Sequence, residues 1–221
     1  AAPLAELAAD AAILADRLAL ERLAVLGVSG GGPHALAVAA ALSDRTALLG
    51  LISPVGPVAD RASAIRMSRL HRFVFTRLGR SDAACAAFFW SVRTLVRLAP
   101  GLAYRALTKR VVASDRALLG RPAVKANLQA ALREGLRPGI EGARQDLRLF
   151  CAPWGLRLEE IDVPAVVWQG SDDSIVPPSA AYLLAEILPH CRLDVIQGAG
   201  HYWVFGQFER VLDTVRAALE T

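Results

Sequence analysis

Cysteine and histidine are scarce in this chain. Its 221 residues include only three cysteines and four histidines, and all of them are scattered. Because Cys85, Cys151 and Cys191 are odd in number and far apart, they offer no disulfide framework. We expect them to be small buried side chains in a protein of a reducing compartment. A metal site needs clustered ligands, so this pattern predicts no metal site. We also expect no cofactor.

The chain also lacks a basic leader and an uninterrupted apolar span. No lysine or arginine precedes Arg17, and Ala1–Asp16 has the pattern of an amphipathic, alanine-rich helix, unlike a signal peptide. Leu23–Ser43 carries no charged residue, but glycine and proline interrupt it at Gly27–Pro33. This break favours a buried strand followed by a buried helix over a transmembrane helix. We expect a soluble, cytoplasmic protein with no membrane partner.

Acidic residues are rare in the middle of the chain. Between Asp60 and Arg157 the basic residues, nearly all arginine, outnumber the acidic ones, whereas both flanking parts are acidic. The arginines are spaced along helical patterns and form no basic block of the kind that favours nucleic-acid binding. We predict a solvated basic surface that pairs in part with the acidic flanks, and no nucleic-acid partner. The sequence leaves the oligomeric state unknown.

A serine lies in a glycine-rich turn near the N-terminus. The motif Gly27-Val28-Ser29-Gly30-Gly31 follows the apolar run Leu23–Leu26 and precedes the alanine-rich stretch Pro33–Leu42. Ser29 therefore falls between a strand and a helix, where small neighbours allow a tight turn. A serine hydroxyl is a poor nucleophile at neutral pH and must project toward a base. The pattern is typical of a nucleophile elbow, although most serines in glycine turns are simple turn residues.

Carboxylates and a histidine follow two strands near the C-terminus. Ala165–Gln169 has the pattern of a buried strand and precedes two adjacent aspartates, Asp172 and Asp173. A second strand, Arg192–Ile196, leads through a glycine-rich loop to His201. Because the carboxyl ends of parallel strands meet at one edge of a sheet, we expect the serine, an aspartate and this histidine to lie together.

The other histidines are weaker candidates for catalysis. His34 lies one turn into the helix after the elbow, which should carry its side chain behind the turn. His71 lies in an arginine-rich helical pattern, and His190 precedes a cysteine in a loop. None of the three follows a strand.

In these motifs and their order the chain resembles the α/β-hydrolase fold family. The resemblance covers Leu23–Ile52 and Ile161–Thr221. It implies that Ser29 attacks an acyl carbonyl and that His201 takes and returns the proton. It also implies that Asp173 fixes the imidazole tautomer and stabilises the imidazolium ion.

The resemblance assigns further positions. It favours Asp173 over Asp172, because the family's aspartate stands three residues before the Val176-Pro177 pair. It assigns the backbone N–H of Gly30 to the oxyanion hole. Three residues are candidates to line the substrate pocket: Trp154, Val176 and Trp203.

The expected fold is of the α/β class, a partial α/β-hydrolase core with an inserted all-helical cap. We predict a parallel sheet flanked by helices, with the core at residues 1–57 and 159–221 and the cap at residues 58–158. The predicted core elements include a helix at Leu4–Leu20, a strand at Leu48–Ile52 and a C-terminal helix at Glu209–Leu219. The cap segment has helical periodicity that glycine and proline interrupt.

The family pattern also includes features that precede the elbow. Several strands come first, and the loop after the third carries a second oxyanion donor, whereas 28 residues precede Ser29 here. We therefore expect the chain to be a fragment that is inactive alone.

The implied function is that of a carboxylesterase-like serine hydrolase acting on a small ester or related carbonyl substrate through an acyl-enzyme. A carbon–carbon bond hydrolase or perhydrolase with the same triad, and a non-catalytic ligand-binding or scaffolding relative, remain open.

Overall fold

The described strands form one parallel sheet. The computed structural model describes residues 2–57, 73–74 and 78–220. The sheet order is β1-β2-β3-β4, which is also the chain order. Each strand runs parallel to its neighbour, so all four carboxyl ends meet at one edge, as predicted. The bounds are β1 Leu23–Val28, β2 Thr46–Ile52, β3 Ala165–Gly170 and β4 Cys191–Ile196.

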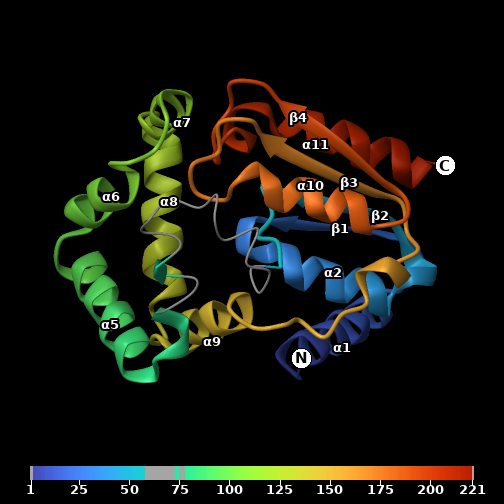
Figure 1. The fold of residues 1–221 in the computed structure, drawn as a ribbon, viewed down its shortest axis with the longest axis horizontal. Coiled ribbons are helices and arrows are strands. Elements are labelled where there is room, and N and C mark those ends of the chain that lie inside the picture. The colour runs from blue at the N-terminus through green and yellow to red at the C-terminus, as the bar shows by residue number, and fades with distance from the viewer. Residues whose placement is uncertain (1, 58–72, 75–77, 221) are drawn as a thin grey trace.

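Helices cover both faces of this sheet (Figure 1). Side chains alternate along a strand, so Leu49 and Leu51 of β2 point to one face and Leu48 and Ile52 to the other. The first pair shares a buried cluster with α1, α2 and α10, and the second packs with α11. Burial on both faces explains the apolar strands in the sequence. These helices are α1 Ala2–Arg17, α2 Gly32–Ala41, α10 Pro178–Ile187 and α11 Val204–Glu220.

Strand β1 forms one edge of the described sheet. It pairs with β2, and no described strand pairs with its other side. Leu26 and Val28 are 37% and 49% exposed there. An open edge with apolar side chains is a template for association with other chains.

A helical insert (α5–α9) separates β2 from β3 and stands beside the sheet (Figure 1). Three of its described helices begin at a capping serine or at a proline. The Ser81 side chain accepts the N–H of Ala84 at the start of α5, and Pro100 and Pro122 open α6 and α8. The described part of the insert contains no strand. The bounds are α5 Asp82–Leu98, α6 Pro100–Thr108, α7 Ala113–Leu119, α8 Pro122–Gly135 and α9 Glu141–Phe150.

Some boundaries differ from those expected from the sequence. Helix α1 ends at Arg17 because Ala19 has a φ of 51°, which a continuing helix cannot accommodate. Helix α11 begins earlier than predicted, at Val204, and a non-helical Gln207 interrupts it. Among the described residues, no helix combines the length and the apolar character that crossing a membrane requires. Short 3-10 turns occupy Ser29–Gly31, Ser43–Arg45, Leu78–Arg80 and Leu158–Glu160.

Candidate active site

Ser29 has a strained backbone at the end of β1. Its φ of 51° lies in the left-handed region, which costs a non-glycine residue on the order of 1–3 kcal/mol. Helix α2 begins three residues later, and the Val55 N–H bonds the Ser29 carbonyl oxygen. The sharp turn lifts the hydroxyl above the edge of the sheet, as a nucleophile elbow does.

Small residues in a tight turn are expected to give the backbone freedom, but Gly27 and Gly31 do not use it in this structure. Neither Gly27 nor Gly31 has a positive φ, so the strain is at the serine itself. A Cβ on Gly27 would lie 2.7 Å from the Cβ of Ala35, so this glycine allows α2 to pack closely on the strand. A Cβ on Gly31 would meet no atom within 4 Å.

His201 lies between the hydroxyl of Ser29 and the carboxylate of Asp173. Its Nε2 is 3.0 Å from Ser29 Oγ, and its Nδ1 is 2.8 Å from Asp173 Oδ2. The histidine and the aspartate are 7% and 6% exposed. A carboxylate accepts hydrogen bonds only, so it holds the proton on Nδ1 and leaves Nε2 free to accept the serine proton.

The two adjacent aspartates have different surroundings. Both oxygens of Asp173 accept hydrogen bonds, because Oδ1 also receives the backbone N–H groups of Ile175 and Val176. Asp172 is exposed, and its Oδ1 accepts the hydroxyl of Ser171. Only Asp173 therefore reaches the imidazole in this structure.

Gln169 supports Asp173, although its place in the sequence predicts only the end of a strand. Its side chain is 1% exposed, and Nε2 donates to Asp173 Oδ2 at 3.0 Å. The same amide nitrogen lies near the carbonyl oxygens of Gly170 and Val176. All three partners are acceptors, which fixes the orientation of the amide. The feature of the sequence that could have indicated this role is a polar residue at the end of an otherwise apolar strand.

Ser53 supports the histidine loop from the end of β2. It is fully buried with a φ of 45°, and its Oγ lies 3.5 Å from the carbonyl oxygen of His201. The indole N–H of Trp203 donates to the same Oγ at 3.2 Å. Trp203 therefore holds the loop from within the core.

The three predicted pocket residues are all deeply buried. Trp154 and Val176 belong to the cluster on the α2 side of the sheet, and Trp203 belongs to the cluster on the α11 side. None of them is more than 5% exposed. Their contact with a substrate stays a prediction.

Helix α9 of the insert lies against the elbow. A Cβ on Gly30 would be 2.8 Å from the Cζ of Phe150, so the ring packs directly on this glycine. His34 Nδ1 donates to the Gly30 carbonyl oxygen, and its Nε2 is 3.7 Å from Asp146. Burial raises the pKa of Asp146, and the charge of His34 opposes that rise.

The remaining histidines and possible metal ligands are placed elsewhere. His190 pairs with Asp162 at the surface, and His71 falls outside the described residues. Over residues 2–57, 73–74 and 78–220, no three histidine, cysteine or acidic side chains gather closely enough to hold a metal ion.

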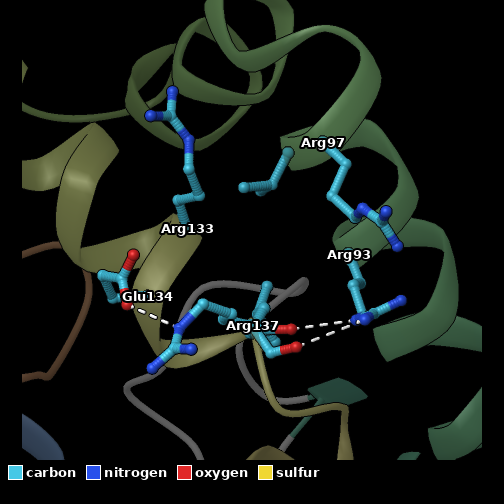
Figure 2. A pocket seen from close by; sticks show the side chains of 7 residues that line it. Arg93, Arg97, Arg133, Glu134 and Arg137 are labelled. Atoms are coloured by element: carbon cyan, nitrogen blue, oxygen red, sulfur yellow. Dashed lines mark hydrogen bonds and ion pairs between the residues drawn. The ribbon is translucent and has the colours of Figure 1, made fainter.

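A cavity of about 370 Å³ lies within the insert, between α5 and α8. Figure 2 shows that the guanidinium groups of its arginines do not converge on one point. Arg93 donates to the carbonyl oxygens of Leu136 and Arg137 just beyond α8, and Arg137 pairs with Glu134. Arg93 thus satisfies two backbone carbonyl groups of the turn that follows α8. None of Ser29, Asp173 and His201 lines this cavity.

Comparisons with known proteins agree on the fold. A family model described as alpha/beta hydrolase fold matches residues 2–206. An esterase from Thermogutta terrifontis superposes with a TM-score of 0.65 at 24% identity, covering 98% of this chain and 72% of that one. An esterase from Exiguobacterium antarcticum has a TM-score of 0.62 at 17% identity, covering 97% of this chain and 72% of that one.

A third solved structure is Est816, described as an N-acyl homoserine lactone degrading enzyme. Its TM-score is 0.61 at 20% identity, with 97% of this chain and 74% of that one covered. No curated protein matched the chain. At such identities the solved structures show a shared fold, and a shared fold alone does not assign an activity.

Proposed function

The chain belongs to the α/β-hydrolase fold family, and from that premise we propose that it is a serine hydrolase that cleaves an ester through an acyl-enzyme. One observation carries the proposal. The imidazole of His201 is hydrogen-bonded on one side to the hydroxyl of Ser29 and on the other to the carboxylate of Asp173. This is the arrangement that activates a serine as a nucleophile.

The first half of the proposed reaction acylates the serine. Ser29 Oγ attacks the substrate carbonyl carbon while His201 Nε2 removes the hydroxyl proton. The carboxylate of Asp173 stabilises the resulting imidazolium ion, and the N–H of Gly30 donates to the oxyanion of the tetrahedral intermediate. As the carbon–oxygen bond to the leaving group breaks, the imidazolium returns its proton to the departing alcohol.

The second half releases the acid. Water takes the place of the alcohol and gives a proton to His201 Nε2 as it attacks the acyl carbonyl. The second tetrahedral intermediate collapses, Ser29 leaves and recovers its proton from the imidazolium, and the carboxylic acid departs. The acyl group sits beside Gly30, where the ring of Phe150 offers an apolar contact.

We also propose that residues 58–158 form a cap over the core segments 1–57 and 159–221. The packing of Phe150 on Gly30 supports this division, since it brings the insert to the nucleophile. Ion pairs inside the insert, Arg148 with Asp82 and Arg144 with Glu141, offset part of its positive charge. We propose on this ground that the insert binds neither nucleic acid nor a membrane. We further propose a small-molecule substrate and a cytoplasmic location.

Labelling by a fluorophosphonate tests the proposed function. The reagent phosphonylates only activated serines, so we expect the full-length protein to be labelled at Ser29 and its Ser29→Ala variant to stay unlabelled. A panel of p-nitrophenyl esters of graded acyl length should then identify the preferred acyl group. If Ser29 of the full-length protein does not react and no ester is cleaved, the protein is a ligand-binding relative without turnover.

A further inference from the structure

Asp115 is a buried carboxylate that connects the insert to the loop of the catalytic histidine. It lies in α7 and is 0% exposed. Its Oδ2 accepts the backbone N–H of His201, and its Oδ1 accepts the backbone N–H of Tyr202, each at 2.8 Å. Hydrogen bonds to an ionised acceptor are roughly twice as strong as neutral ones. The two bonds thus fix two consecutive peptide groups of the loop.

The residues around Asp115 leave space for its carboxylate. A Cβ on Gly200 would lie 2.2 Å from Asp115 Oδ2 and 2.5 Å from Val112 Cγ2, so only glycine lets α7 approach. On the far side, Tyr202 packs against the insert cluster that contains Tyr104. The insert therefore contacts both the backbone and a side chain of this loop.

A contribution to folding stability does not by itself explain why the carboxylate of Asp115 is buried at this position. Burial raises the pKa of Asp115, although its two backbone hydrogen bonds oppose the rise. A buried carboxylate is costly in free energy, and replacing buried charges with apolar groups is often neutral or stabilising. The hydrogen bonds of this side chain to the loop are the favourable interactions that stand against this cost.

We propose that Asp115 is a positioning residue that couples docking of the helical insert to alignment of His201. The inference rests on the proposed function. The imidazole must contact Ser29 and Asp173 at the same time, and the position of the His201 backbone determines where the ring lies. Because α7 supplies both bonds, the histidine is fully aligned only when the insert is docked on the core.

Asp115 does not act as a second acid for the imidazole. Its two oxygens bond backbone N–H groups, whereas His201 Nδ1 bonds Asp173. Loss of Asp115 should therefore move the ring without changing its tautomer. Displacement of a catalytic group by about 1 Å can cost roughly 100-fold in rate.

The test is kinetic and uses Asp115→Asn, which keeps the size of the side chain. An asparagine offers one acceptor in place of two, and its amide nitrogen would face a backbone N–H. We expect kcat for a p-nitrophenyl ester to fall roughly 10- to 100-fold with KM changed less than about twofold. Val96→Ala removes buried volume from a separate cluster of the insert and serves as the control, with kcat kept within about twofold.

Amide hydrogen exchange gives a second readout that does not depend on turnover. The amides of His201 and Tyr202 should exchange faster in Asp115→Asn and remain protected in Val96→Ala. If Asp115→Asn cannot be folded, Gly200→Ala displaces the same carboxylate from the core side and should give the same pattern.

The outcomes separate the two proposals. A wild-type kcat in Asp115→Asn, an equal loss in Val96→Ala, or unchanged exchange at both amides would overturn the positioning role. A wild-type, full-length protein that neither reacts with a fluorophosphonate nor cleaves esters would overturn the proposed function. In that case faster exchange confined to this loop would still support the link between Asp115 and the loop.

Discussion

The Nε2 atom of His201 lies 3.0 Å from the Oγ atom of Ser29, although 172 positions separate the two residues in the chain. The parallel sheet creates this proximity. Ser29 follows β1 and His201 follows β4, and the carboxyl ends of both strands lie at the same edge. Residues at this edge of an open parallel sheet meet in space whatever their distance in sequence.

The two adjacent aspartates give a matched pair of variants. Asp173→Asn should lower kcat by about 10⁴-fold, because an amide stabilises the wrong imidazole tautomer. Asp172→Asn makes the same chemical change one position away, on an exposed side chain, and should leave kcat within about twofold. Steady-state hydrolysis of a p-nitrophenyl ester measures both. A severe loss in Asp172→Asn with a mild one in Asp173→Asn would show that the third triad member is wrongly assigned.

Gln169 should matter for activity through Asp173. Gln169→Leu keeps the approximate volume and removes the donor to Asp173 Oδ2, so we expect kcat to fall about 10-fold. It also leaves buried acceptors unpaired, which should lower the free energy of unfolding by about 1–3 kcal/mol. Gln129→Leu is the control, since Gln129 donates to the carbonyl oxygen of Pro100 away from the triad. Equal kinetic effects in the two variants would contradict a specific role for Gln169.

The sequence could not predict the roles of residues whose partners are far away along the chain. Apolar runs and glycine-rich loops located the strands and the residues that follow them, since these depend on local pattern. The pattern could not reveal the support from Gln169, Ser53 or Asp115. Each of them interacts with a group whose position depends on tertiary packing. Asp115 lies 86 positions from His201, and nothing in the local pattern around it points to that partner.

Asp115 also predicts a pH dependence of stability. Because burial raises the pKa of Asp115 above its ordinary value, the folded chain keeps this proton to higher pH than the unfolded chain. The unfolding free energy therefore contains a component that is lost as pH rises through the raised pKa. The charges of Asp173 and His201 act on the same group in opposite directions.

Urea unfolding between about pH 4 and pH 7 measures this component. The stability of the wild type relative to Asp115→Asn should decrease with rising pH in the acid range and then become constant. A difference that increases with pH would mean that the pKa of Asp115 is lowered by folding, contrary to this structure.

The open edge of β1 predicts self-association of the 221-residue chain. Its exposed Leu26 and Val28 leave apolar surface beside unpaired backbone groups. Sedimentation velocity over a range of concentrations should show association that Leu26→Lys reduces. Leu98→Lys adds the same charge at a site on α5 that is 81% exposed, and it should have little effect. A chain that stays monomeric at every concentration would rule out association through β1.

Trapping of an acyl group on Ser29 tests the central claim most directly. Mixing the full-length protein with excess p-nitrophenyl acetate and quenching within the first turnovers should show a burst of p-nitrophenol and an acetyl group on the peptide that contains Ser29. The His201→Ala variant should lose the burst, because the serine then lacks its base. Ester cleavage without an acyl adduct, or with the adduct on another residue, would contradict the account.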